Sequence, residues 1–159
     1  MSRPGRPQRL PLEAYEGERS CAFTACMCDH HPFFLSPEVV EPQIEFLKRA
    51  GDEFGCIVVV YCFMPDHLHV MFQGTGGESN CLAAMRKFKL LSGLWMHRKK
   101  VLGWQEDFYD HLVWGSKDWR AHARYIALNP VRASLVESYL DYPFLGSLVG
   151  EVQEVIAPV

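Results

Sequence analysis

Short apolar runs separated by polar breaks divide the chain into predicted strands. Residues 20–28 (SCAFTACMC) are β-prone and stop at the polar sequence DHHP, so they predict a first strand. The runs CIVVVYCFM and HLHVMFQ, residues 56–64 and 67–73, flank a Pro-Asp pair. Proline presets φ and aspartate accepts backbone hydrogen bonds, so this pair favours a turn and the two runs predict a β-hairpin. The aromatic residues 104–114 (WQEDFYDHLVW) predict a fourth strand.

Apolar residues at helical spacing predict three helices. The sequence Ser-Pro-Glu at 36–38 has the order of a cap, a first-turn proline and a first-turn acid, so a helix begins there. A second helix is predicted over residues 80–98. Its apolar face comprises Leu82, Met85, Phe88, Leu91 and Trp95. A third helix begins near Ser116, and Asn129-Pro130 strains or ends it because the proline ring disfavours the α region at the preceding residue.

The order of these elements indicates the fold class. The order strand-helix-strand-strand-helix-strand-helix predicts an α+β fold, in which a ferredoxin-like antiparallel sheet has its helices packed on one face. A chain of 159 residues is long enough for one domain with one core, which we assign to residues 20–147. Residues 1–19, in which arginines alternate with prolines, predict a flexible basic arm, and residues 148–159 predict a C-terminal tail.

Composition and charge narrow the class of protein. With 48% hydrophobic, 22% charged and 13% aromatic residues, the chain resembles neither a disordered protein nor a coiled coil nor a collagen. It has no apolar run long enough for a membrane span and no secretion signal, so we expect a cytoplasmic protein without a membrane partner, and its six cysteines reduced. The net charge of −3 does not indicate nucleic-acid binding, which must therefore depend on local clusters of basic residues.

The tripeptide His67-Leu68-His69 carries the strongest chemical signal. Alternate side chains of a strand share a face, so both imidazoles point the same way and could hold one metal ion with coordination positions left open. Tyr125 and Asn129 lie four residues apart on the last predicted helix, where a phenol would stand beside an amide oxygen. The alternatives are two structural histidines at a sheet edge and a half-buried helix tyrosine.

Longer motifs around these residues resemble a known family. MPDHLHVMF is similar to the histidine motif, and ARYIALNPVRASLV followed by DYPF to the tyrosine motif, of the REP-associated tyrosine transposases. These are single-tyrosine members of the HUH endonuclease superfamily, whose name denotes two histidines flanking an apolar residue. WQEDFYDH resembles a segment that the family places just before the tyrosine helix. The resemblance spans roughly residues 20–147.

The resemblance implies roles for individual residues. It makes His67 and His69 metal ligands, Tyr125 the nucleophile and Asn129 the third ligand, where related enzymes often have glutamine. It implies a metal-dependent endonuclease and transposase that cleaves and rejoins single-stranded DNA at hairpin-associated sites through a 5′-phosphotyrosine, without a nucleotide cofactor. We expect the metal to be Mg²⁺ or Mn²⁺. Relatives include monomers and homodimers, so assembly of the site in cis or in trans stays open.

Several further residues could assist this reaction. A free phenol has a pKa of about 10, so Tyr125 needs help to attack at neutral pH, for which His122 and His111 are candidates. Exposed rings such as Trp104, Phe108 or Tyr109 could stack on unpaired bases. Phosphates require cations. The predicted DNA-binding residues are Arg86, Lys87, Lys89, Arg98, Lys99, Lys100, Arg120, Arg124 and Arg132.

Three alternative functions compete with this interpretation. Nucleotide hydrolases of the histidine-triad type use H-x-H-x-H, but Met71 occupies the fifth position here. A zinc-stabilised structural module could use Cys26, Cys28, His30 and His31, although their spacing is unusual for a zinc finger. A third possibility is a DNA-hairpin binding protein that has lost cleavage activity.

Overall fold

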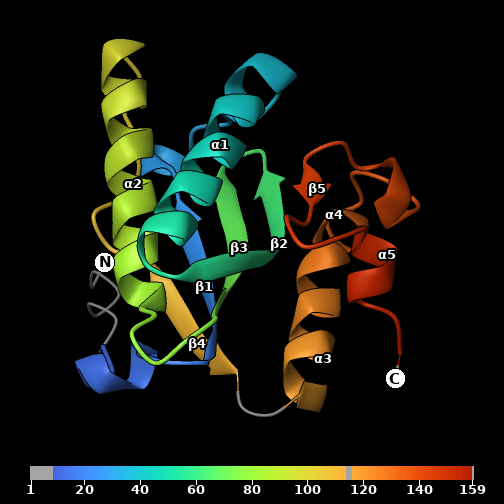
Figure 1. The fold of residues 1–159 in the computed structure, drawn as a ribbon. Coiled ribbons are helices and arrows are strands. Elements are labelled where there is room, and N and C mark those ends of the chain that lie inside the picture. The colour runs from blue at the N-terminus through green and yellow to red at the C-terminus, as the bar shows by residue number, and fades with distance from the viewer. Residues whose placement is uncertain (1–8, 114–115, 159) are drawn as a thin grey trace, which may run out of the picture.

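A five-stranded antiparallel sheet forms the centre of the part of the chain that the structure describes, residues 9–113 and 116–158 (Figure 1). The structure is a computed structural model. The strands are β1 (Ser20–Cys26), β2 (Cys56–Met64), β3 (His67–Gly74), β4 (Tyr109–Val113) and β5 (Leu145–Gly146). Their order in the sheet is β4-β1-β3-β2-β5. The first four strands have the predicted ferredoxin-like arrangement, and β5 adds an edge strand that the sequence pattern did not predict.

The predicted hairpin is formed by β2 and β3. Met64 pairs with His67 across the turn, and the backbone N–H groups of Phe33 and Phe34 donate to the Pro65 carbonyl. The Met27 N–H donates to the Asp66 carbonyl. Backbone hydrogen bonds from Met27, Phe33 and Phe34 therefore hold the turn that directly precedes His67.

The helices begin and end near the predicted residues. They are α1 (Pro37–Glu53), α2 (Cys81–Arg98), α3 (Ser116–Ala127), α4 (Asn129–Arg132) and α5 (Val152–Val155). Short 3₁₀ turns cover Leu12–Tyr15, Cys28–His30 and Tyr139–Asp141. The Asn80 side chain caps α2 by accepting a hydrogen bond from the Ala83 N–H, 2.9 Å away. α3 ends at Ala127, ahead of Pro130, as the proline rule predicts.

The α+β class and the antiparallel sheet are confirmed, but the helices do not all lie on one face as we expected. α1 and α2 cover one face, over a core that includes Leu68, Val70 and Phe72. α3 covers the other face, where its residues Ala123 and Ile126 pack in a second core. Both faces of the central strands carry apolar residues, so each face needs a covering layer.

The two ends of the chain belong to the domain more closely than predicted. Residues 1–8 of the expected arm lie outside the described residues. From Arg9 onward the flexible arm is not found: the Arg9 guanidinium donates to the Asp110 carboxylate at 3.0 Å and to the Phe108 carbonyl at 2.7 Å, and Tyr15 is buried. The C-terminal tail also packs, because Ile156 is buried in the core beneath α3.

The expectations drawn from composition can be compared with the described residues. The six cysteines are free thiols, as expected, and four of them are buried. No helix in the described ranges is both long and apolar enough to cross a membrane.

Replacing Leu68 by alanine should lower the free energy of unfolding by about 2–5 kcal/mol, because it removes a fully buried side chain from the core under β3. Leu90→Ala makes the same chemical change on the exposed side of α2 and should alter the free energy by about 0.5 kcal/mol or less. Urea denaturation followed by circular dichroism measures both. Equal losses in the two variants would contradict the assigned core.

Candidate functional site

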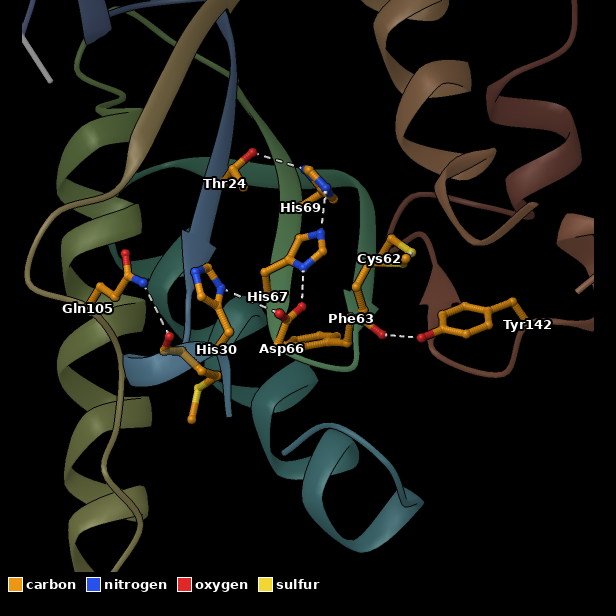
Figure 2. A network of polar contacts seen from close by, with 11 residues as sticks. Thr24, His30, Cys62, Phe63, Asp66, His67, His69, Gln105 and Tyr142 are labelled. Carbon is orange, nitrogen blue, oxygen red and sulfur yellow. Dashed lines mark hydrogen bonds and ion pairs between the residues drawn. The ribbon is translucent and has the colours of Figure 1, made fainter. Parts of the chain in front are cut away.

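The two histidines of β3 face each other. Their Nε2 atoms lie 3.1 Å apart and their rings meet edge to face, at a centroid distance of 4.8 Å (Figure 2). In an octahedral site with bonds of about 2.1 Å, neighbouring ligand atoms also lie about 3 Å apart. His67 and His69 are therefore spaced as two ligands of one small divalent ion would be.

Each histidine is oriented through its other ring nitrogen. His67 Nδ1 lies 2.6 Å from the Asp66 carboxylate, and His69 Nδ1 lies 3.0 Å from the Thr24 hydroxyl (Figure 2). The carboxylate holds the proton of His67 on Nδ1, which leaves the Nε2 lone pair free. The threonine hydroxyl can donate or accept, so it suits either tautomer of His69. With the proton of His69 also on Nδ1, both Nε2 lone pairs are available to a metal ion.

His69 is held in its neutral form. Burial lowers its pKa to about 3, and the charges of His67, Arg132 and His122 act in the same direction. A metal ligand must be an unprotonated imidazole, so this site offers one without displacement of a proton. Both histidines remain partly exposed, which keeps the pair accessible to solvent and substrate.

Tyr125 lies near the end of α3 with its ring 55% exposed. The Arg132 guanidinium lies over this ring, 3.8 Å from its centroid, and also donates to the Tyr125 carbonyl at 2.6 Å. On α3, the His122 ring stacks with Tyr125 at a centroid distance of 5.9 Å. α3 packs on the sheet face toward which His67 and His69 point, where Ala123 and Ile126 share a core with Met71 of β3.

Asn129, the expected third ligand, begins α4 directly after the break in the helix. Its amide nitrogen is buried and has no hydrogen-bond partner within the described residues. Rotation of the amide would exchange this nitrogen for the carbonyl oxygen, which is a suitable ligand for Mg²⁺ or Mn²⁺. Among the described residues no hydrogen bond joins Asn129 to His67 or His69, so its role as a ligand stays a prediction.

Some of the predicted DNA-binding cations donate hydrogen bonds to backbone carbonyls, and the others are exposed or form an ion pair. Lys89 donates to the carbonyls of Gln105 and Glu106, whereas Arg120 and Arg124 donate to carbonyls of the C-terminal segment. These three charges serve the fold, and we do not propose them as DNA contacts. Lys87 pairs with Glu53 at 3.3 Å, and Arg86 is exposed on α2, across the sheet from the histidines. Exposed cations at the end of α2 are Arg98, Lys99 and Lys100.

The aromatic residues predicted to stack on bases differ in exposure. Phe108 is buried, and Trp104 is partly buried with its indole N–H donating to the Ser92 hydroxyl at 2.9 Å. Both pack in the core beneath α2, which corrects the expectation that they are exposed. Tyr109 on β4 is 53% exposed and remains a candidate for stacking.

Comparisons with known proteins identify relatives in sequence. No protein-family model matches the chain. A Haemophilus influenzae protein assigned to the REP-associated tyrosine transposases is 25% identical over 134 residues, which cover 77% of this chain and 76% of that protein. The REP-associated tyrosine transposase of Escherichia coli K12 is 30% identical over 81 residues, 51% of this chain and 48% of that protein.

Two solved structures share the fold. A REP-associated tyrosine transposase bound to a REP hairpin superposes with a TM-score of 0.72 and 21% identity, over 91% of this chain and 82% of that chain. A Deinococcus radiodurans protein assigned as a transposase superposes with a TM-score of 0.50 and 16% identity, over 78% of this chain and 94% of that chain. The chain resembles the REP-associated tyrosine transposases.

The remaining motifs shared with the REP-associated tyrosine transposases support the histidine hairpin. In the DYPF sequence, the Tyr142 hydroxyl donates to the Phe63 carbonyl at 2.6 Å (Figure 2), and the Phe63 N–H donates to the Phe144 carbonyl at 2.9 Å. In the WQ sequence, the backbone N–H of Gln105 donates to the Cys26 carbonyl at 2.8 Å. Cys26 is the β1 partner of His67, so both motifs fix backbone next to the site.

Two of the alternative functions, the zinc-stabilised module and the histidine-triad hydrolase, lose support. Among residues 9–113 and 116–158, no group of three or more histidine, cysteine or acidic side chains could hold a metal, which argues against the zinc module. Cys28 instead donates to the Trp104 carbonyl, and His30 pairs with Asp66 at 3.5 Å. Met71 is fully buried, so the position of the third triad histidine lies within a core.

Sequence reasoning missed the contribution of Thr24 and assigned Asp66 mainly to the turn. Thr24 comes to His69 only through the pairing of β1 with β3, and no local pattern marks it. The contact of Arg132 with the Tyr125 ring was also missed, although a spacing of seven residues along a nearly continuous helix places both on one side.

Asp66→Asn should weaken the binding of Mn²⁺ to the purified protein by about 10–100-fold, because it removes the carboxylate that orients His67. Isothermal titration calorimetry measures the affinity. Asp52→Asn, an exposed change on α1, is the matched control and should leave the affinity unchanged. Unaltered Mn²⁺ binding in Asp66→Asn would show that this contact does not support a metal site.

Proposed function

We propose that this protein is a transposase that cleaves and rejoins single-stranded DNA at sites beside DNA hairpins. The observation that carries the proposal is that the His67 and His69 Nε2 atoms converge on the sheet face covered by α3, the helix that bears Tyr125. The relatives support it, because they are REP-associated tyrosine transposases and the structure of one contains a REP hairpin. DNA is the substrate in this proposal, and no nucleotide cofactor takes part.

His67 and His69 would hold a divalent ion, Mg²⁺ or Mn²⁺, with Asn129 as a third ligand. The spacing of the two Nε2 atoms and the neutral state of His69 fit such an ion. When bound, the ion would polarise the scissile phosphate and offset charge that develops on its oxygens. Two or three protein ligands leave coordination positions for phosphate oxygens and water.

Tyr125 is the proposed nucleophile. Its phenol oxygen forms a bond to phosphorus while the bond from phosphorus to the 3′-oxygen breaks. The phenol proton leaves to solvent or a neighbouring base, and the departing 3′-oxygen takes a proton from solvent. The products are a 5′-phosphotyrosine and a free 3′-hydroxyl. A 3′-hydroxyl can later attack the phosphotyrosine and restore a phosphodiester, so the bond energy is retained in the covalent link. Rejoining therefore needs no external energy source.

Arg132 is placed to assist this step. Its guanidinium lies over the Tyr125 ring and carries a permanent positive charge, which would offset negative charge that develops during the attack. The same charge would attract the phosphate. Arg98, Lys99 and Lys100, exposed at the end of α2, are further candidate phosphate contacts in a chain whose net charge is −3.

A homodimer remains a prediction. Within one chain, α3 already covers the sheet face that carries the histidines, so a site assembled in cis needs no partner. A DNA-hairpin binding protein without cleavage activity is the alternative function. An assay for a covalent protein–DNA adduct separates the two functions, because binding without an adduct would favour the alternative.

Tyr125→Phe should abolish the covalent protein–DNA adduct and preserve DNA binding, because it removes only the attacking oxygen. The assay incubates the protein with labelled single-stranded hairpin DNA and Mn²⁺, then separates the products on a denaturing gel. Tyr109→Phe is the matched control, since Tyr109 is as exposed as Tyr125 and should not affect the adduct. An adduct that persists in Tyr125→Phe would identify another nucleophile.

Arg132→Gln should slow adduct formation by about tenfold or more, because it removes the cation that lies over the Tyr125 ring. Arg132→Lys keeps the charge without the planar guanidinium and should give an intermediate rate. Single-turnover kinetics at saturating DNA separate this effect from weaker binding. Wild-type rates in Arg132→Gln would exclude the proposed assistance.

A further inference from the structure

A hollow lies between β4 and α3, next to Tyr125. Its volume is about 400 Å³, within the range of small-molecule sites. It is lined by His111, Leu112, Val113, Asp118, Ala121, His122 and Tyr125. β4 is an edge strand of the sheet, so a chain segment can reach the hollow from the side. The hollow adjoins the proposed nucleophile and shares no lining residue with the histidine pair.

The rings around this hollow form a continuous stack. His111 and His122 lie nearly parallel, with centroids 5.0 Å apart and planes inclined by 19°. His122 in turn stacks with Tyr125, and the Arg132 guanidinium lies over the Tyr125 ring. The rings meet face to face, which gives stacking contact rather than an in-plane hydrogen bond. Flat rings in series are the surfaces on which unpaired bases stack.

The charges of the hollow suit a base better than a phosphate. Asp118 contributes a carboxylate to the lining, which repels phosphate oxygens. Burial and the neighbouring His111 lower the pKa of His122, so this ring is neutral at neutral pH and offers no cation to an anion. A carboxylate accepts hydrogen bonds from the N–H groups on the edge of a base. Guanine presents two adjacent N–H donors, whereas thymine presents one between two carbonyl oxygens.

We propose that the hollow between β4 and α3 binds one unpaired nucleobase of the DNA strand that Tyr125 attacks, with a preference for guanine over thymine. The proposal rests on the proposed function, because it assigns a base subsite to the same substrate. Stacking on the exposed His111 ring, which ends the stack, supplies the affinity, and Asp118 supplies the preference. A base held there would place the adjoining phosphate near the Tyr125 hydroxyl.

The test uses the full chain without added metal, so that it does not depend on cleavage. The probes are the pentanucleotides d(TTGTT), d(TTTTT) and d(TTXTT), where X is an abasic site. We expect d(TTGTT) to shift the imidazole NMR signals of His111 and His122 at a lower concentration than d(TTTTT) does, and the abasic probe to shift them no more than d(TTTTT). Equal shifts with the abasic probe, or no shift with d(TTGTT), would overturn the base subsite.

Variants of the hollow test the two contributions separately. His111→Ala should weaken the binding of d(TTGTT) by about tenfold, and His111→Phe, which restores a flat ring, should bind as the wild type does. Asp118→Asn should remove the preference for d(TTGTT) over d(TTTTT). Failure of the phenylalanine rescue would exclude stacking by His111, and an unchanged preference in Asp118→Asn would exclude recognition by the carboxylate.

These outcomes are distinguishable from failure of the proposed function. If the pentanucleotide shifts the histidine signals but no covalent adduct forms on hairpin DNA, the subsite stands and the cleavage chemistry fails. If the adduct forms through Tyr125 while the histidine signals ignore the base, the cleavage chemistry stands and the subsite fails.

Discussion

The alternation of side chains along β3 is the constraint on which the site depends. Leu68, Val70 and Phe72 enter the core beneath α1 and α2, and their burial fixes the register of β3 between β1 and β2. His67 and His69 must then face the other side. A slip of one residue would bury both imidazoles in the phenylalanine-rich core and expose apolar side chains to solvent. The free energy that positions the two histidines therefore comes largely from the opposite face of the sheet.

β3 places the two histidines on one face, and polar contacts around them then fix the orientation of their rings. Asp66 and Thr24 fix the ring orientations from the hairpin turn and from β1, and the turn itself is fastened by backbone hydrogen bonds. Because the Thr24 hydroxyl can donate or accept, His69 can hydrogen-bond to His67 without a metal and present its lone pair when a metal is bound.

The basic residues of this chain, whose net charge is −3, differ in what their charges contact. Lys89, Arg120 and Arg124 are occupied by backbone carbonyls, which explains why a count of basic residues is a poor guide to a DNA surface here. Arg132 also donates to a backbone carbonyl, that of Tyr125, but its guanidinium in addition lies over the Tyr125 ring and lowers the pKa of His69. The face of α3 toward β4 is different again, with stacked rings and an acidic residue. The Arg132 guanidinium and the stacked His122 ring thus both contact the ring of Tyr125.

The sequence by itself determined the hairpin, the three long helices and the pair of histidines on one face, because turn chemistry and side-chain periodicity are local properties. It also supplied the motifs that indicate the family. Only the tertiary structure decided that α3 covers the histidine face, since that depends on which apolar surface remains after α1 and α2 have packed. The same holds for Thr24 beside His69, 45 residues away along the chain, because strand pairing and not sequence proximity joins them.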